Sequence, residues 1–104
     1  MSSRDRPKIV CLCGSTRFKE EFERVERELT LAGCIVLTVG LFGHREPDFD
    51  WERHKEALDE LHLRKIDMAD EVLVINVGGY VGESTAREIE YARKTGKAVR
   101  FIHG

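Results

Sequence analysis

Four short apolar runs along the chain alternate with longer stretches in which apolar and charged residues are mixed. The runs are residues 9–13, 35–38, 72–76 and 98–102. The first run is apolar without alternation, which is typical of a central strand covered by helices on both faces. Arg100 interrupts the last run and indicates a strand at an edge of the sheet. The pattern predicts four β-strands, with the two most apolar runs, the first and third, at the centre.

The stretches between the runs predict three helices. They span residues 17–31, 51–68 and 83–94. In the first, apolar residues from Phe18 to Leu29 recur at intervals of three and four, as on one face of an amphipathic helix. A single helix over the second stretch would be about 27 Å long, whereas the neighbouring strand needs about 17 Å. We therefore expect a break near Asp59.

The alternation of strands and helices predicts a single α/β domain over residues 1–104. Parallel strands joined by right-handed crossovers, with helices on both faces, give a small three-layer sandwich of the Rossmann-like or flavodoxin-like type. We expect a four-stranded sheet of order 2-1-3-4. Ligands of such sheets bind at the carboxyl ends of the strands where the order reverses. Residues 14–17 and 78–85 meet there, and residues 40–50 form a loop over one end of the sheet.

The composition is that of an ordinary globular protein, with 41% hydrophobic and 35% charged residues among 104. A net charge of −2 gives no strong attraction to a nucleic acid polymer or a membrane surface. No apolar stretch reaches the roughly 18 residues of a membrane span, and the polar amino terminus lacks the apolar segment of a signal peptide. We expect a cytoplasmic protein.

The three cysteines, Cys11, Cys13 and Cys34, lie in or beside apolar runs, so we expect buried, reduced thiols. Cys11 and Cys13 alternate along one strand, and no second cysteine or histidine pair has the spacing of a zinc site. The spacing therefore predicts no metal site.

The loop after the first strand carries groups suited to an anion. Gly14 allows a tight turn and a close approach to a ligand, Ser15 offers a hydroxyl, and Arg17 presents a planar fork suited to phosphate. The alternative is that Ser15 only caps the helix and Arg17 is solvated.

The second loop contains three glycines in five positions, residues 78–82, which suggests backbone close to a ligand. Glu88 follows in or near the first turn of the last helix, where the helix dipole would keep a carboxylate ionised for nucleophilic attack. The spacing Thr85-x-x-Glu88 also matches a capping box, in which Glu88 only binds a backbone N–H. Spacing alone favours the box. His62, on the second helix, is either a surface residue or lies near the crevice.

At these positions the sequence resembles the nucleoside 2-deoxyribosyltransferase superfamily, which includes deoxynucleoside monophosphate N-glycosidases and pyrimidine nucleotide hydrolases. The resemblance covers residues 9–102. Its markers are Cys-Gly-Ser-Thr-Arg at residues 13–17, Ala-Asp-Glu-Val at residues 69–72, and Ser-Thr-Ala-Arg-Glu-Ile at residues 84–89.

The resemblance implies that Glu88 is the catalytic nucleophile or its electrostatic equivalent, and that Ser15 and Arg17 bind a 5′-phosphate. The expected activity is cleavage of the N-glycosidic bond of a nucleotide or nucleoside, by hydrolysis or transfer, with no metal or cofactor. His62 is a candidate proton donor to the departing base, because its unperturbed pKa lies near neutrality. The remaining expected substrate-binding residues are Gly14, Gly82 and Ser84.

Some features depart from the family pattern. His62 aligns with a carboxylate that contacts the sugar in several relatives, and Gly82 stands where relatives have aspartate or serine. Relatives usually add a fifth strand and a tail that reaches a partner subunit. These departures leave open a non-catalytic module that binds or senses a nucleotide, and an inert structural subunit. The family also implies a homodimer or larger homo-oligomer, for which Trp51, Phe42 or Phe49 could supply an apolar contact.

Overall fold

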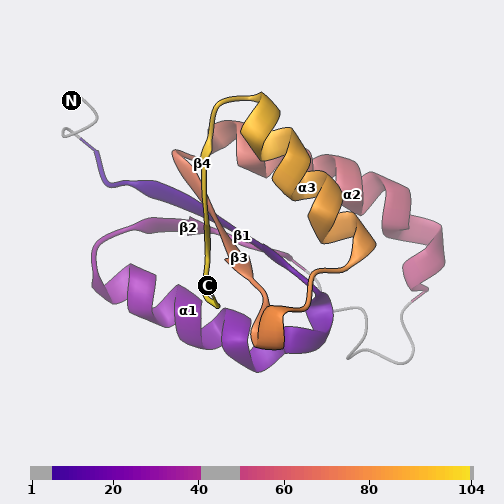
Figure 1. The fold of residues 1–104 in the computed structure, drawn as a ribbon, viewed down its shortest axis with the longest axis horizontal. Helices are drawn as coiled ribbons and strands as arrows, with labels where there is room; N and C mark the ends of the chain where they lie inside the picture. The colour runs from indigo at the N-terminus through magenta and orange to yellow at the C-terminus, as the bar shows by residue number, and fades with distance from the viewer. Residues whose placement is uncertain (1–5, 41–49, 104) are drawn as a thin grey trace.

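A computed structural model describes residues 6–40 and 50–103 (Figure 1). Four parallel strands form one sheet of order β2-β1-β3-β4. The strands are β1 (Ile9–Gly14), β2 (Ile35–Leu37), β3 (Glu71–Ile75) and β4 (Ala98–Phe101). The predicted order and the central places of β1 and β3 are confirmed, as is the edge position of the strand that carries Arg100.

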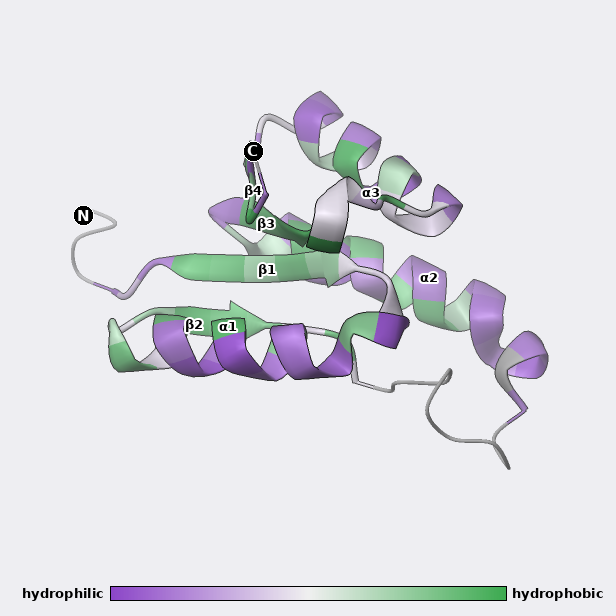
Figure 2. Ribbon diagram, turned by 60° about the horizontal axis from the view of Figure 1, so that its bottom comes forward, coloured by the Kyte–Doolittle hydropathy of each residue, from purple (hydrophilic) through white to green (hydrophobic). Residues whose placement is uncertain are grey.

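Helices cover both faces of the sheet, which confirms the predicted three-layer α/β sandwich (Figures 1 and 2). Helix α1 (Lys19–Leu31) lies on one face, and α2 (Trp51–Met68) and α3 (Glu83–Lys94) lie on the other. Two 3₁₀ turns, η2 (Thr16–Phe18) and η4 (Val77–Gly79), follow β1 and β3. The helix expected to begin at Arg17 therefore starts after one tighter turn.

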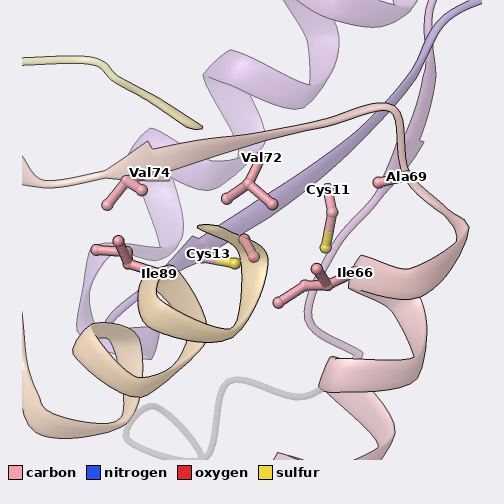
Figure 3. Close-up of a cluster of buried hydrophobic side chains, with 8 residues drawn as sticks. Cys11, Cys13, Ile66, Ala69, Val72, Val74 and Ile89 are labelled. Atoms are coloured by element: carbon pink, nitrogen blue, oxygen red, sulfur yellow. The ribbon is translucent and has the colours of Figure 1, made fainter. Parts of the chain in front are cut away.

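The side chains of β1 alternate between two cores. Val10 and Leu12 pack toward α1, while Cys11 and Cys13 pack toward α2 and α3, and none of the four has any exposed surface. The core under α2 and α3 consists of Cys11, Cys13, Ile66, Ala69, Val72, Val74, Ile89 and Ala92 (Figure 3). Cys34, just before β2, is only partly buried, and all three thiols are reduced. The expected burial holds fully for the two cysteines of β1.

The expected break in the second helix is wrong, because α2 runs without interruption for 18 residues. It contains no glycine or proline, and ion pairs one turn apart join Lys55 to Asp59 at 2.9 Å and Glu60 to Arg64 at 3.3 Å. Its amino-terminal half projects beyond the carboxyl ends of the strands (Figure 2). The excess length thus forms a wall beside the carboxyl ends of the strands, where a ligand is expected.

Some sequence expectations concern residues that the structure does not describe. Most of the loop expected over residues 40–50, including Phe42 and Phe49, lies outside the described residues, as does the side chain of Trp51. Within residues 6–40 and 50–103, no helix has the length and apolar character needed to cross a membrane.

Candidate functional site

A cavity of about 420 Å³ opens where β1 and β3 end, between the turns that follow them and the projecting half of α2. The volume lies in the range of pockets for small molecules. All seven residues named from the sequence line it: Gly14, Ser15, Arg17, His62, Gly82, Ser84 and Glu88. The fold therefore brings together groups from the end of β1, the middle of α2 and the start of α3.

In the turn after β1, one residue is required for packing of the sheet, one caps the next turn, and one lies at the rim of the cavity. Gly14 has a φ of +157°, and a Cβ there would lie 2.8 Å from the carbonyl oxygen of Ile75, so glycine is required for close approach of β1 to β3. Ser15 caps η2 by accepting a hydrogen bond from the backbone N–H of Arg17 at 3.3 Å. The guanidinium of Arg17 stacks over the ring of Tyr80, 4.6 Å from its centroid. This stacking orients the fork of Arg17 at the cavity rim.

The glycines after β3 serve two purposes. Gly78 and Gly79 have φ values of +63° and +85°, which only glycine adopts readily, and neither lines the cavity. The idea that all three glycines approach a ligand is therefore wrong for these two. Gly82 does line the cavity and is the residue that precedes α3. Ser84 accepts a hydrogen bond from Lys55 at 3.1 Å, which ties α3 to α2.

The start of α3 excludes one of the two roles considered for Glu88. The helix begins at Glu83, so Thr85 is its third residue and Glu88 its sixth. A capping box would need Thr85 outside the helix as the N-cap, so the capping-box alternative is wrong. Glu88 lies in the second turn, partly buried, with its side chain on the cavity.

Burial raises the pKa of Glu88 above that of an ordinary glutamate. The positive charge of His62 and a hydrogen bond with the Cys13 thiol lower this pKa, but by less than burial raises it. The expectation that the helix dipole keeps this pKa low is wrong, because the dipole's effect falls off within the first turn. Glu88 therefore exchanges its proton closer to neutrality than a surface carboxylate does.

His62 is buried, with 6% of its surface exposed, so the surface alternative is wrong. Its Nε2 lies 3.0 Å from the carbonyl oxygen of Leu12; because a carbonyl only accepts, Nε2 carries the proton. Among the described residues, the Leu12 carbonyl has no partner in the sheet. The Lys8 carbonyl, four residues earlier, accepts a hydrogen bond from the N–H of Ile35 at the start of β2. Because carbonyls alternate along a strand, the Leu12 carbonyl points to the same side, but β2 has already ended opposite Cys11. His62 thus supplies the hydrogen bond that the short strand cannot, and Nδ1 is the nitrogen left to exchange protons with a ligand.

Burial lowers the pKa of His62, but the hydrogen bond with Cys11 and the negative charge of Glu88 outweigh burial, so that its pKa lies above the ordinary value. The two thiols are coupled as well. Hydrogen bonding from Cys13 lowers the pKa of Cys11, and the same contact raises the pKa of Cys13. Glu88 and His62, which line the cavity, are therefore electrostatically connected to two thiols buried beneath it.

Other cavity residues were not identified from the sequence. Thr16 is 8% exposed, and its hydroxyl has no hydrogen-bond partner among the described residues, so a ligand atom could satisfy it. Lys55, Lys65 and Tyr80 also line the cavity. Lys55, Asp59 and His62 recur at intervals of four and three along α2, a spacing that could have indicated one polar face.

A scan against models of protein families and a search of curated proteins both found no match to this chain. Functional assignment therefore rests on the residues themselves. Of the three sequence markers of the resemblance, residues 13–17 end β1 and enter η2, residues 69–72 lead into β3, and residues 84–89 lie in α3.

Proposed function

We propose that the protein cleaves the N-glycosidic bond of a nucleoside 5′-monophosphate or a nucleoside, by hydrolysis or by transfer to a second base. One observation carries the proposal: Glu88, His62 and Arg17, which are far apart in the sequence, line one cavity at the point where the strand order reverses. A carboxylate, an imidazole and a guanidinium around one pocket provide a nucleophile, a proton donor and an anion-binding group.

In this mechanism, ionised Glu88 attacks C1′ of the sugar or stabilises it as it becomes oxocarbenium-like. The chemistry parallels that of retaining glycosidases, in which a carboxylate forms a glycosyl–enzyme bond as the leaving group departs. Water, or a second base, then breaks that bond and gives up a proton to the neutral imidazole of His62, which restores the carboxylate and the imidazolium. Because the pKa of Glu88 is raised, its ionised fraction begins to fall at a higher pH than that of an ordinary glutamate.

Departure of the base requires a proton, and His62 is the proposed donor. Its raised pKa makes the imidazolium fraction larger, at any given pH, than that of an ordinary histidine. Because Nε2 is bonded to the Leu12 carbonyl, the proton passes from Nδ1. The negative charge of Glu88 supports the imidazolium before the reaction, and both groups become neutral as the glycosyl bond forms and the base leaves.

The 5′-phosphate is proposed to bind at the turn after β1. Arg17 offers a two-pronged charged donor, and its stacking on Tyr80 reduces the rotamer freedom that binding would otherwise cost. The Thr16 hydroxyl, which lacks a partner among the described residues, adds a neutral donor, and Ser15 stands beside both. This arrangement favours a nucleotide over an uncharged nucleoside.

The test is Glu88→Ala with a panel of nucleoside monophosphates, following free base by chromatography. Loss of the nucleophile should reduce base release at least about a thousandfold. Glu90→Ala is the matched control, because Glu90 is exposed on the same helix and does not line the cavity. Circular dichroism establishes that both variants fold. Base release that persists undiminished in Glu88→Ala refutes the assignment, and calorimetric nucleotide binding without base release by the unmodified protein would instead support a binding module.

A further inference from the structure

Two thiols and an imidazole meet in the core directly beneath the cavity. The sulfurs of Cys11 and Cys13 project from the same side of β1, toward α2 and α3 (Figure 3). Both cysteines are fully buried and His62 is 6% exposed. One donor atom from each residue lies within 4.8 Å of the other two. Because β1 and α2 supply these residues from positions 49 and 51 apart, their spacing along the chain does not reveal the cluster.

The two nitrogen-to-sulfur separations match those of ligands around a tetrahedral zinc ion. Bonds of about 2.0–2.1 Å to nitrogen and 2.3 Å to sulfur, at tetrahedral angles, put a nitrogen and a sulfur ligand about 3.6 Å apart. Nε2 of His62 lies 3.5 Å from Sγ of Cys13 and 3.7 Å from Sγ of Cys11. The imidazole therefore stands at the separation from each sulfur that a shared zinc ion requires, and the two sulfurs lie within 4.8 Å of each other.

The carbonyl oxygen of Leu12 lies beside this set, 3.0 Å from Nε2 of His62 and 3.9 Å from Sγ of Cys11. At present the proton on Nε2 satisfies it. A cation bound to Nε2 would take the place of that proton, leaving the ring neutral with its one remaining proton on Nδ1, and would give the carbonyl a positive neighbour. The backbone acceptor that β2 leaves unpaired would then remain satisfied.

The charges also balance. Two thiolates neutralise a divalent cation, so the buried cluster would carry no net charge and avoid the large cost of burying an isolated ion. A disulfide suits the same cysteines poorly. Residues two apart on a strand are separated by about 6.4–6.8 Å, at the upper limit of about 6.8 Å between the Cα atoms of a disulfide, and their side chains project in parallel.

We propose that Cys11, Cys13 and His62 form a binding site for zinc or a similar thiophilic divalent cation. Thiolate and imidazole ligands select such ions over magnesium or calcium. The site goes beyond the proposed function, because metal binding requires no nucleotide. Where the proposed function also holds, a bound ion would occupy Nε2 of His62 next to Glu88 and inhibit base release.

The experiment uses the full chain, reduced and stripped of metal with a chelator under anaerobic conditions. Titration with Co²⁺ should give one equivalent of bound metal, an intense sulfur-to-cobalt charge-transfer band, and the visible bands of tetrahedral cobalt. Zinc should then displace cobalt and abolish the spectrum. If the charge-transfer band and the visible bands are both absent at saturating Co²⁺, the proposal is overturned, whatever the outcome for base release.

Variants separate this site from adventitious binding. Cys13→Ser should weaken zinc affinity at least about a hundredfold, and His62→Gln should alter the visible bands while its amide still donates to the Leu12 carbonyl. Cys34→Ser is the matched control, because Cys34 packs in the other core, and it should retain one equivalent and the full spectrum. Loss of the spectrum in Cys34→Ser, or an unchanged spectrum in His62→Gln, overturns the assignment. Should Cys13→Ser fail to fold, the cobalt titration of the unmodified protein still tests the proposal.

Discussion

Two buried or partly buried glutamates stand at opposite ends of the sheet, and their pKa values shift in opposite directions. Burial tends to raise the pKa of Glu71, at the amino end of β3, but hydrogen bonds from Arg100 and Lys8 outweigh it, and the pKa lies below the ordinary value. Burial raises the pKa of Glu88, at the carboxyl end, and its neighbours His62 and Cys13 do not compensate. The partners decide the direction, not burial itself.

The same contrast extends to each end as a whole. At the amino end, charges are paired: Lys8 lies 3.0 Å from Glu71, and Arg6 binds Asp70 through two hydrogen bonds of 2.8 Å. At the carboxyl end, Arg17 has a ring contact and no carboxylate partner among the described residues. Paired charges stabilise a fold, whereas charges with incomplete pairing at a cavity remain available to a ligand.

After the loss of Glu88 itself, the largest effect should come from removing the proton donor at the carboxyl end. His62→Gln should lower base release by about 100- to 10,000-fold, the usual contribution of general acid catalysis. The glutamine amide can still donate to the Leu12 carbonyl, so the fold should be retained. His54→Gln, at an exposed position of α2 outside the cavity, is the control and should keep full activity.

The pH profile sharpens the same prediction. Activity requires ionised Glu88, so it should fall as the pH drops through a pKa that is raised above the ordinary glutamate value of about 4.3. It also requires protonated His62, so it should fall as the pH rises through a pKa raised above the ordinary histidine value of about 6.5. His62→Gln should lose the alkaline limb only. An alkaline limb that survives in this variant would exclude His62 as the donor.

A smaller effect is expected at the phosphate position. Arg17→Ala should lower kcat/KM for a nucleoside monophosphate by about 10- to 100-fold, which corresponds to loss of a charged hydrogen bond. The matching nucleoside, which lacks the phosphate, should be little affected. Arg17→Lys should recover only part of the loss, because lysine keeps the charge without the planar fork. Equal losses for both substrates would place the phosphate elsewhere.

The fold could be predicted from the sequence because a parallel strand buried on both faces consists of an uninterrupted run of apolar residues. Arg100 marked an edge strand, and the apolar character of residues 9–13 and 72–76 marked the centre. The error at Asp59 came from assuming that a helix must match the strand it covers. Nothing in helix energetics imposes that match, and α2 continues past the sheet edge with its own ion pairs.

The site was predictable as a set of residues but not as an electrostatic arrangement. Loop residues after β1 and before α3 must meet in a parallel sheet of this order, so Ser15 could be named in advance. Glu88 was named through the family resemblance, because spacing alone favoured a capping box. The pKa of Glu88 could not, because it depends on where α3 begins and on burial against Cys13 and His62. Contacts between β1 and α2 are set by tertiary packing, which short-range spacing does not encode.

The smallest effect is expected at the amino end, where charge serves stability. Glu71→Gln should lower the free energy of unfolding by about 1–2 kcal/mol, since Arg100 and Lys8 are themselves largely exposed and lose only part of their interaction. A folded-state pKa below the unfolded one stabilises the protein above the unfolded pKa, and this contribution is lost as pH falls through the folded pKa. The urea midpoints of the two proteins should therefore converge on acidification, while base release at neutral pH stays unchanged. A midpoint difference that persists below both pKa values would mean that packing, rather than charge pairing, distinguishes Glu71 from Glu88.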